Sequence, residues 1–160
     1  MQTPFISEAT IESISEKINE SRNSIDQAIS DMQAKQPVLF SYYFSDGLKL
    51  LTSEEREYLL YLGLIIWQTI SASIPDLPLV SAEIIESAEE ENWQVLNDSN
   101  AKKFREKLDI FFKSYPQEDL LAFVEDAMVD DEDTFVTKEG RELLFISLKT
   151  SIDVLCGIKQ

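Results

Sequence analysis

The sequence predicts an all-α fold, an irregular bundle of about seven helices around a buried central helix from Tyr58 to Ile74. Only 4 glycines and 5 prolines in 160 residues leave few turns for a many-stranded sheet. Apolar residues recur at helical spacing through most of the chain, and residues that cap or break helices bound these segments. The length suits one core, so we expect a single all-helical domain over residues 1–160.

The first predicted helix begins near Thr3-Pro4 or at Ser7 and continues to Lys35 as one long amphipathic helix. Its apolar stripe is made of isoleucines and one methionine, namely Ile11, Ile14, Ile18, Ile25, Ile29 and Met32. The stripe weakens at Ser21, which favours a helix packed on a core over a coiled-coil seam.

A short apolar and aromatic segment follows over residues 38–44, between Pro37 and Gly47. A strand is one interpretation of this segment. We favour a short buried helix, because proline suits the first position of a helix and no second strand is evident to pair with it.

The central helix is predicted to begin at a capping box, in which the Thr52 hydroxyl and the Glu55 carboxylate satisfy each other's backbone N–H groups. No charged residue occurs from Tyr58 to Ile74, which makes this segment the only candidate for a membrane span. Its second half is rich in polar residues, so we interpret it as a buried helix of a globular protein. The prolines at 75 and 78 then predict a packed, extended crossover.

Four further helices are predicted after the crossover. Ser81 begins the first, a clean helical spacing of aromatic and aliphatic residues marks the second from Ala101 to Tyr115, Pro116 begins the third, and the fourth extends from Thr137 to Gly157.

Part of the chain resembles an earlier part at a shift of 85 residues. The five matches are Thr52, Glu54, Arg56, Glu57 and Leu59 with Thr137, Glu139, Arg141, Glu142 and Leu144. Two pseudo-repeated three-helix units joined by the fourth helix would account for them. The alternative is that the first turns of capped helices resemble one another in any protein.

The chain is strongly acidic, with 30 acidic and 14 basic residues, a net charge of -16 and a pI near 4.2. Nucleic acid and anionic membranes would be repelled, so we expect neither as a partner. We favour a protein partner, and a basic protein is one candidate. A single cysteine and the absence of a secretory leader at the start of the sequence predict a cytoplasmic protein.

Two acidic segments are candidates for a divalent cation, and Mg²⁺ and Ca²⁺ are the only cofactors we consider. In the first, Asp131, Asp133 and Glu142 take the first, third and twelfth positions of an EF-hand loop, but Phe135 and Val136 violate that motif. In the second, Glu86, Glu89 and Glu90 share a helical face, as the Mg²⁺ ligands of an all-α nucleotide hydrolase would. We interpret both segments as solvated acidic surfaces.

Histidine does not occur in the chain, which excludes Ser-His, Cys-His and histidine-ligated metal chemistry. We expect the lone thiol, Cys156, to be a small buried hydrophobic group and not a nucleophile. The sequence therefore favours a non-enzymatic protein-interaction or regulatory module. One alternative is an acidic inhibitor of a basic enzyme, either immunity-like or mimicking nucleic acid. The other is the Mg²⁺-dependent hydrolase of nucleotides. The basic helix from Lys102 to Lys113 also suggests a homodimer, if it faces the acidic loop of a second copy.

Overall fold

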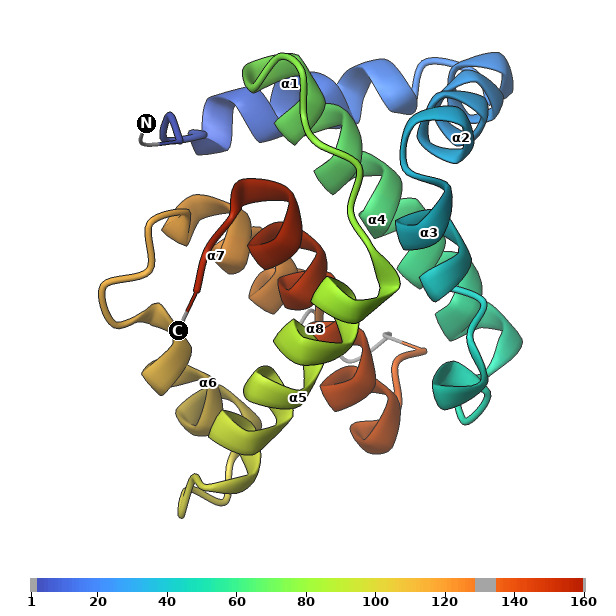
Figure 1. Cartoon of the computed structure of the whole chain (residues 1–160). Coiled ribbons are helices and arrows are strands. Elements are labelled where there is room, and N and C mark those ends of the chain that lie inside the picture. The colour runs from blue at the N-terminus through green and yellow to red at the C-terminus, as the bar shows by residue number, and fades with distance from the viewer. Residues whose placement is uncertain (1–2, 129–134, 160) are drawn as a thin grey trace.

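The structure, a computed structural model, describes residues 3–128 and 135–159 and is all-helical over them (Figure 1). These residues form eight α-helices and one short 3₁₀ helix, η1, and no strand occurs among them. In chain order the elements are α1 (Glu8–Ile18), α2 (Arg22–Lys35), α3 (Pro37–Tyr42), η1 (Asp46–Leu48), α4 (Ser53–Ser73), α5 (Ala82–Asn97), α6 (Phe104–Phe112), α7 (Glu118–Met128) and α8 (Lys138–Cys156). The prediction of an all-α bundle is confirmed.

The prediction of one long helix from Ser7 to Lys35 is wrong, because the chain turns between α1 and α2. The backbone N–H of Asn19 donates back to the carbonyl oxygens of Ser15 and Lys17, which ends α1. The Ser21 hydroxyl then accepts a hydrogen bond from the backbone N–H of Ser24 at 3.1 Å and starts α2. The residue that weakens the apolar stripe is therefore the N-cap of a new helix.

The centre of the molecule consists of α4 and α8, which pack against each other. The predicted burial of the Tyr58–Ile74 segment is confirmed, since Leu59, Ile66 and Ile70 have no exposed surface. Helix α8 is buried to the same degree and also contacts α5 and α7. Burying a large aliphatic or aromatic side chain contributes roughly 1.5–3 kcal/mol, so these two helices carry much of the folding free energy.

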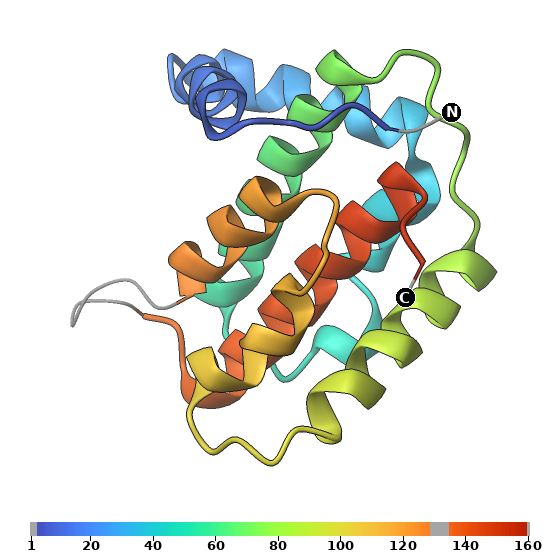
Figure 2. The same cartoon turned by 90° about the vertical axis from the view of Figure 1, so that its left-hand side faces the viewer.

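The other helices surround this pair. Helix α1 runs across the top of the molecule in Figure 1, where it packs on α4 and α7, and it is seen end-on in Figure 2. Helix α5 packs along α8, and α7 lies beside α8 in both views. In the described part of the chain, no helix has both the length and the hydropathy that crossing a membrane requires.

The start of the described chain lies beside the C-terminus of α8. The Thr3 hydroxyl donates a hydrogen bond to the carbonyl oxygen of Cys156 at 3.1 Å. Gly157 follows in a left-handed conformation with φ 67°, and its N–H donates to the carbonyl oxygen of Asp153, which ends α8.

Candidate binding groove

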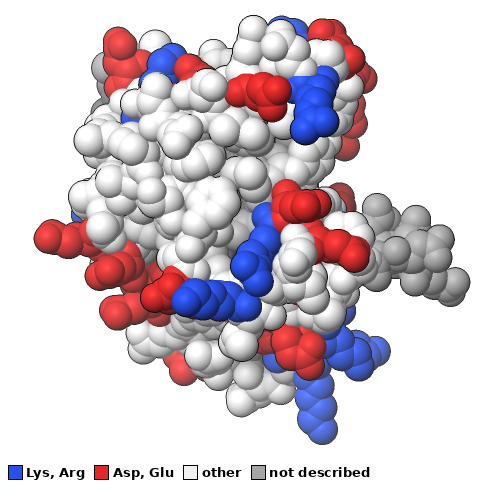
Figure 3. All heavy atoms as spheres, turned by 90° about the vertical axis from the view of Figure 1, so that its right-hand side faces the viewer, with Lys and Arg blue, Asp and Glu red and all other residues white. Residues whose placement is uncertain are grey.

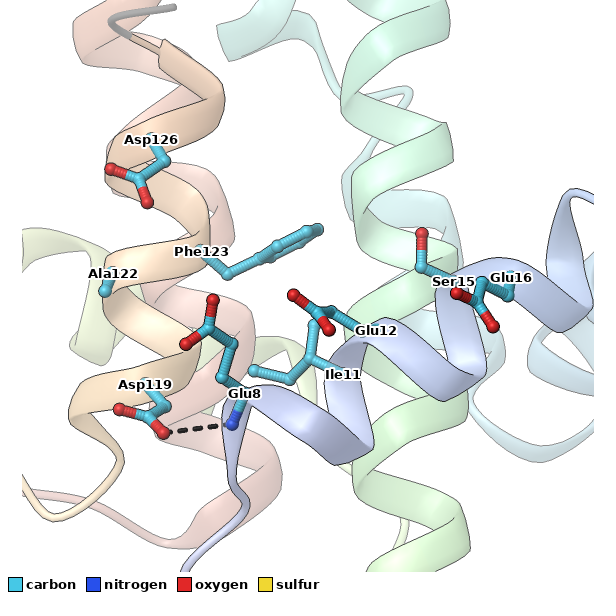
Figure 4. A pocket seen from close by; sticks show the side chains of 9 residues that line it. All are labelled: Glu8, Ile11, Glu12, Ser15, Glu16, Asp119, Ala122, Phe123 and Asp126. Atoms are coloured by element: carbon cyan, nitrogen blue, oxygen red, sulfur yellow. Dashed lines mark hydrogen bonds between the residues drawn. The ribbon is translucent and has the colours of Figure 1, made fainter.

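A groove lies between α1 and α7, on the side of the molecule where α1 crosses the bundle (Figure 4). The start of α1 is held against the start of α7, because the backbone N–H of Glu8 donates a hydrogen bond to the Asp119 carboxylate at 2.9 Å. The open space has a volume of about 320 Å³. Its lining residues come from these two helices alone: Glu8, Ile11, Glu12, Ser15, Glu16, Asp119, Ala122, Phe123 and Asp126.

The α1 wall carries a row of carboxylates because Glu8, Glu12 and Glu16 are spaced four residues apart, which places them on one face of the helix. All three residues are exposed. In Figure 4 the carboxylates of Glu8 and Glu12 extend over the space between the helices. Among the described residues, no hydrogen bond or ion pair joins these two carboxylates to α7.

The α7 wall adds two more carboxylates and the apolar floor. Asp119 and Asp126 are seven residues apart and therefore share a face. Phe123 lies between them in sequence and projects toward α1, where Ile11 points back toward it (Figure 4). The groove thus has an apolar floor between two acidic rims.

No lysine or arginine lines this groove. The nearest cation among the described ion pairs is Arg105, which lies 3.7 Å from the Asp126 carboxylate. Both side chains of this pair are largely exposed, so water screens it and it contributes about 0–1 kcal/mol. The acidic rims therefore keep most of their charge available to a partner.

Glu125, also on α7, has a carboxyl group whose pKa is shifted upward. Burial raises the pKa of this carboxyl above its usual value, Arg105 lowers it, and the neighbouring Asp126 and Asp109 raise it further. The net direction is upward, and burial is its largest cause.

Acidic residues are unevenly distributed over the rest of the surface. Figure 3 shows a face with a broad uncharged area left of its centre and a concentration of acidic side chains at its lower left edge. Helix α5 has a large acidic face of its own, with exposed Glu83, Glu86 and Glu90.

The metal candidates that lie in the described part of the chain are not gathered into a site. Among residues 3–128 and 135–159, no group of three or more acidic or cysteine side chains is placed to hold a metal ion. Glu86, Glu89 and Glu90 follow one another along α5, and Glu142 lies 3.6 Å from Lys107 in an ion pair. Asp131 and Asp133, and with them the proposed calcium loop, lie outside the described residues.

A polar cluster is buried where α5, α8 and the connection between α6 and α7 meet. The Lys149 ammonium donates hydrogen bonds to Asp153 and to the Asn92 side chain, both at 2.8 Å. Asp153 also accepts from Asn92 at 3.0 Å and from the Tyr115 hydroxyl. The ammonium lies 4.9 Å from the centre of the Tyr115 ring and 5.2 Å from that of Phe111.

The charges in this cluster are nearly inaccessible, since 1% of the Lys149 side chain and 3% of the Asp153 side chain are exposed. Burial lowers the pKa of Lys149, and the adjacent Asp153 carboxylate opposes that effect. Burial, followed by the charge of Asp153, raises the pKa of Tyr115. The cluster joins three segments of the chain, and the described contacts account for both carboxylate oxygens of Asp153. We therefore assign it a structural role.

Cys156 is buried, as the sequence predicts. Burial, and after it the charge of Asp153, raises the pKa of the thiol to about 12. A thiol in this state carries very little thiolate near neutral pH, which makes it a poor nucleophile.

Sequence reasoning missed the groove. The sequence shows a glutamate at every fourth position, at Glu8, Glu12 and Glu16. It does not show which other helix lies beside that face. The opposing wall comes from residues 119–126, more than a hundred positions away, and only the fold brings the two together.

Comparisons of this chain with protein-family models, with curated proteins and with solved structures find no match.

Proposed function

We propose that this protein is a non-enzymatic protein-interaction module that binds a basic, amphipathic segment of a partner protein in the groove between α1 and α7. The observation that carries this proposal is the combination of five carboxylates with an apolar floor and no basic residue in one groove. A partner segment would place an apolar side chain on Ile11 and Phe123, and lysines or arginines against the two rims.

The energetics favour recognition by several weak contacts. A single exposed ion pair contributes about 0.2–1 kcal/mol, so one pair would not hold a partner. Several such pairs around one buried apolar side chain would combine specificity, from the spacing of the charges, with affinity from the apolar contact. The net charge of -16 would also increase the rate of encounter with a basic partner at low salt.

An acidic inhibitor that covers the basic site of an enzyme is a second candidate with the same charge preference. The exposed acidic face of α5, with Glu83, Glu86 and Glu90, favours this candidate because several exposed carboxylates on one helix complement a broad basic surface. The two candidates differ in which carboxylates they require.

A peptide titration separates them. The probe is a fluorescently labelled amphipathic peptide of leucine and lysine, and its binding is measured by anisotropy at two salt concentrations. The groove variant Glu8→Gln, Glu12→Gln, Glu16→Gln and the control variant Glu83→Gln, Glu86→Gln, Glu90→Gln each remove three exposed glutamate charges from one helix. We expect binding that weakens with salt and falls about tenfold or more only in the groove variant.

Equal losses in the two variants would favour the general acidic surface and the inhibitor candidate. Binding that survives in the groove variant and disappears in the control would reject the groove as the site.

A further inference from the structure

Two buried glutamines hold two backbone segments in the same way. The Gln117 amide nitrogen donates to the carbonyl oxygen of Pro4 at 2.8 Å, and its oxygen accepts from the N–H of Ile6 at 3.0 Å. The Gln36 amide nitrogen donates to the carbonyl oxygen of Pro78 at 2.9 Å, and its oxygen accepts from the N–H of Val80 at 3.0 Å. Each side-chain amide thus pairs with an extended backbone as a neighbouring strand would.

The two segments that are held also resemble each other in sequence. Each consists of a proline, an exposed apolar residue, a buried aliphatic residue and a serine that caps the next helix. The likeness continues into α1 and α5 at a shift of 74 residues. The identical residues are Pro4, Ser7, Ile11, Glu12, Ser13 and Glu16, which match Pro78, Ser81, Ile85, Glu86, Ser87 and Glu90.

Each half of the described chain contains four α-helices. Helices α1 to α4 correspond in order to α5 to α8, and the glutamine that holds the other segment comes shortly before α3 in one half and α7 in the other. Thr52 caps α4 and Thr137 caps α8, each with its hydroxyl accepting from the backbone N–H three residues later. These threonines belong to the similarity at a shift of 85 residues.

The contacts between the halves are reciprocal. Gln36 of the first half holds the segment of the second, and Gln117 of the second half holds the segment of the first. Helix α1 packs on α7 and, correspondingly, α5 packs on α3. The most extensive helix contact between the halves pairs α4 with its own counterpart, α8. An isologous dimer has this pattern, in which element i contacts j and j contacts i.

We infer that the chain consists of two related four-helix units, residues 3–73 and 78–157, which pair within one chain as the subunits of a symmetric dimer do. The crossover at residues 74–77 links them. The surface between the units is therefore an interface of the subunit type, and it fits the complementary unit of a second copy of this chain. The units contain four helices each, one more than the three that the sequence predicts.

The first test cleaves the full-length folded protein. One variant carries a protease site at Asp76, between the units, and a control variant carries the same site at Asn100, in the loop between α5 and α6 of the second unit. After cleavage, the fragments are separated in urea and mixed again. We expect the two units to restore a one-to-one complex with native circular dichroism, and the control fragments to restore much less. Equal recovery from the two cuts, or no recovery of the two units, would overturn the inference.

The second test shortens the crossover. Deletion of Pro75, Asp76 and Leu77 shortens the extended crossover by about 10 Å. We expect the two units of one chain to be unable to pair across the shortened crossover. We expect a dimer of native helicity by light scattering, in which each unit pairs with the complementary unit of the other copy. A folded monomer would show that the surface does not accept a second copy. If the shortened chain fails to fold, the recovery of the cleaved units decides the inference.

Discussion

The side chain of Glu55 on α4 occupies the space beside Gly140 on α8, where any larger residue would place its Cβ against the carboxylate. Glu55 is fully buried, and one of its oxygens accepts the N–H of Thr52 at 2.8 Å. The other accepts the N–H and the hydroxyl of Thr137, at 2.8 and 2.9 Å. One carboxylate therefore completes the N-termini of both central helices, and the two helices approach closely because position 140 has no side chain.

The substitution Gly140→Ala tests whether the close packing of α4 and α8 requires glycine at this position. The added methyl group would have to displace the Glu55 carboxylate from its hydrogen bonds with Thr52 and Thr137. We expect the free energy of unfolding to fall by about 2–4 kcal/mol, as for a buried charged group that loses its partners. Urea denaturation measures the change.

The matched control is the same substitution in a Glu55→Ala background. Without the carboxylate the methyl group has room, and alanine is the better helix former by roughly 1 kcal/mol. Gly140→Ala should then be neutral or stabilising. A loss of the same size in both backgrounds would show that Glu55 is not the group that requires glycine.

The acidity of Glu55 predicts how stability depends on pH. Burial alone would raise its pKa, but the hydrogen bonds from Thr52 and Thr137 outweigh that effect and hold the pKa below its usual value. A depressed pKa contributes stability that is complete above the unfolded-state pKa of about 4.3 and is lost as the pH falls through the folded-state value.

The variant Glu55→Gln should therefore be less stable than the wild type by about 2 kcal/mol near neutral pH. The difference should remain constant down to about pH 5 and shrink below about pH 4. Taking the difference between the two proteins cancels the titration of the many surface carboxylates. A difference that grows on acidification would contradict the lowered pKa.

The buried pair of Lys149 and Asp153 should be strongly coupled, unlike the more exposed pair of Lys107 and Glu142. Removal of Asp153 by Asp153→Ala leaves a buried ammonium without its counter-charge and should cost about 3–5 kcal/mol. In a Lys149→Met background the same substitution should cost about 2 kcal/mol less. The corresponding cycle for Lys107 and Glu142 should give less than about 1 kcal/mol, and similar values for both pairs would refute the distinction.

Cys156 should be almost unreactive in the folded protein. With its pKa raised to about 12, the thiolate fraction at pH 8 is about a thousandfold lower than for an unperturbed thiol. A chromogenic disulfide reagent should therefore label the native protein very slowly and the urea-unfolded protein rapidly. Equal rates in the two states would show that the thiol is accessible.

Local sequence patterns predict contacts between residues a few positions apart, but not contacts between distant segments. The capping box at Thr52 and Glu55 was predictable because its two residues are three positions apart, and the structure confirms it. The second partner of Glu55, Thr137, is 82 positions away, and no local pattern points to it. The division at Ser21 was missed because the isoleucine spacing continues on both sides of the turn.

The candidate site follows the same rule. A row of glutamates at intervals of four is a local signal on α1, whereas a groove needs a second helix at a definite distance. The glutamates of α5 are spaced as regularly in the sequence as those of α1. In the structure they lie along one helix and form no cluster with acidic groups of another described helix. Only the position of α7 distinguishes the two rows.

The most direct test of the proposed function locates a bound peptide on the folded protein. Amide resonances of ¹⁵N-labelled protein are followed during titration with the amphipathic leucine–lysine peptide. We expect the largest shifts at Ile11, Glu12, Ala122 and Phe123, which line the groove, and little change at Glu86 and Glu90 on α5. Shifts concentrated on α5, or spread evenly over the acidic surface, would contradict the account.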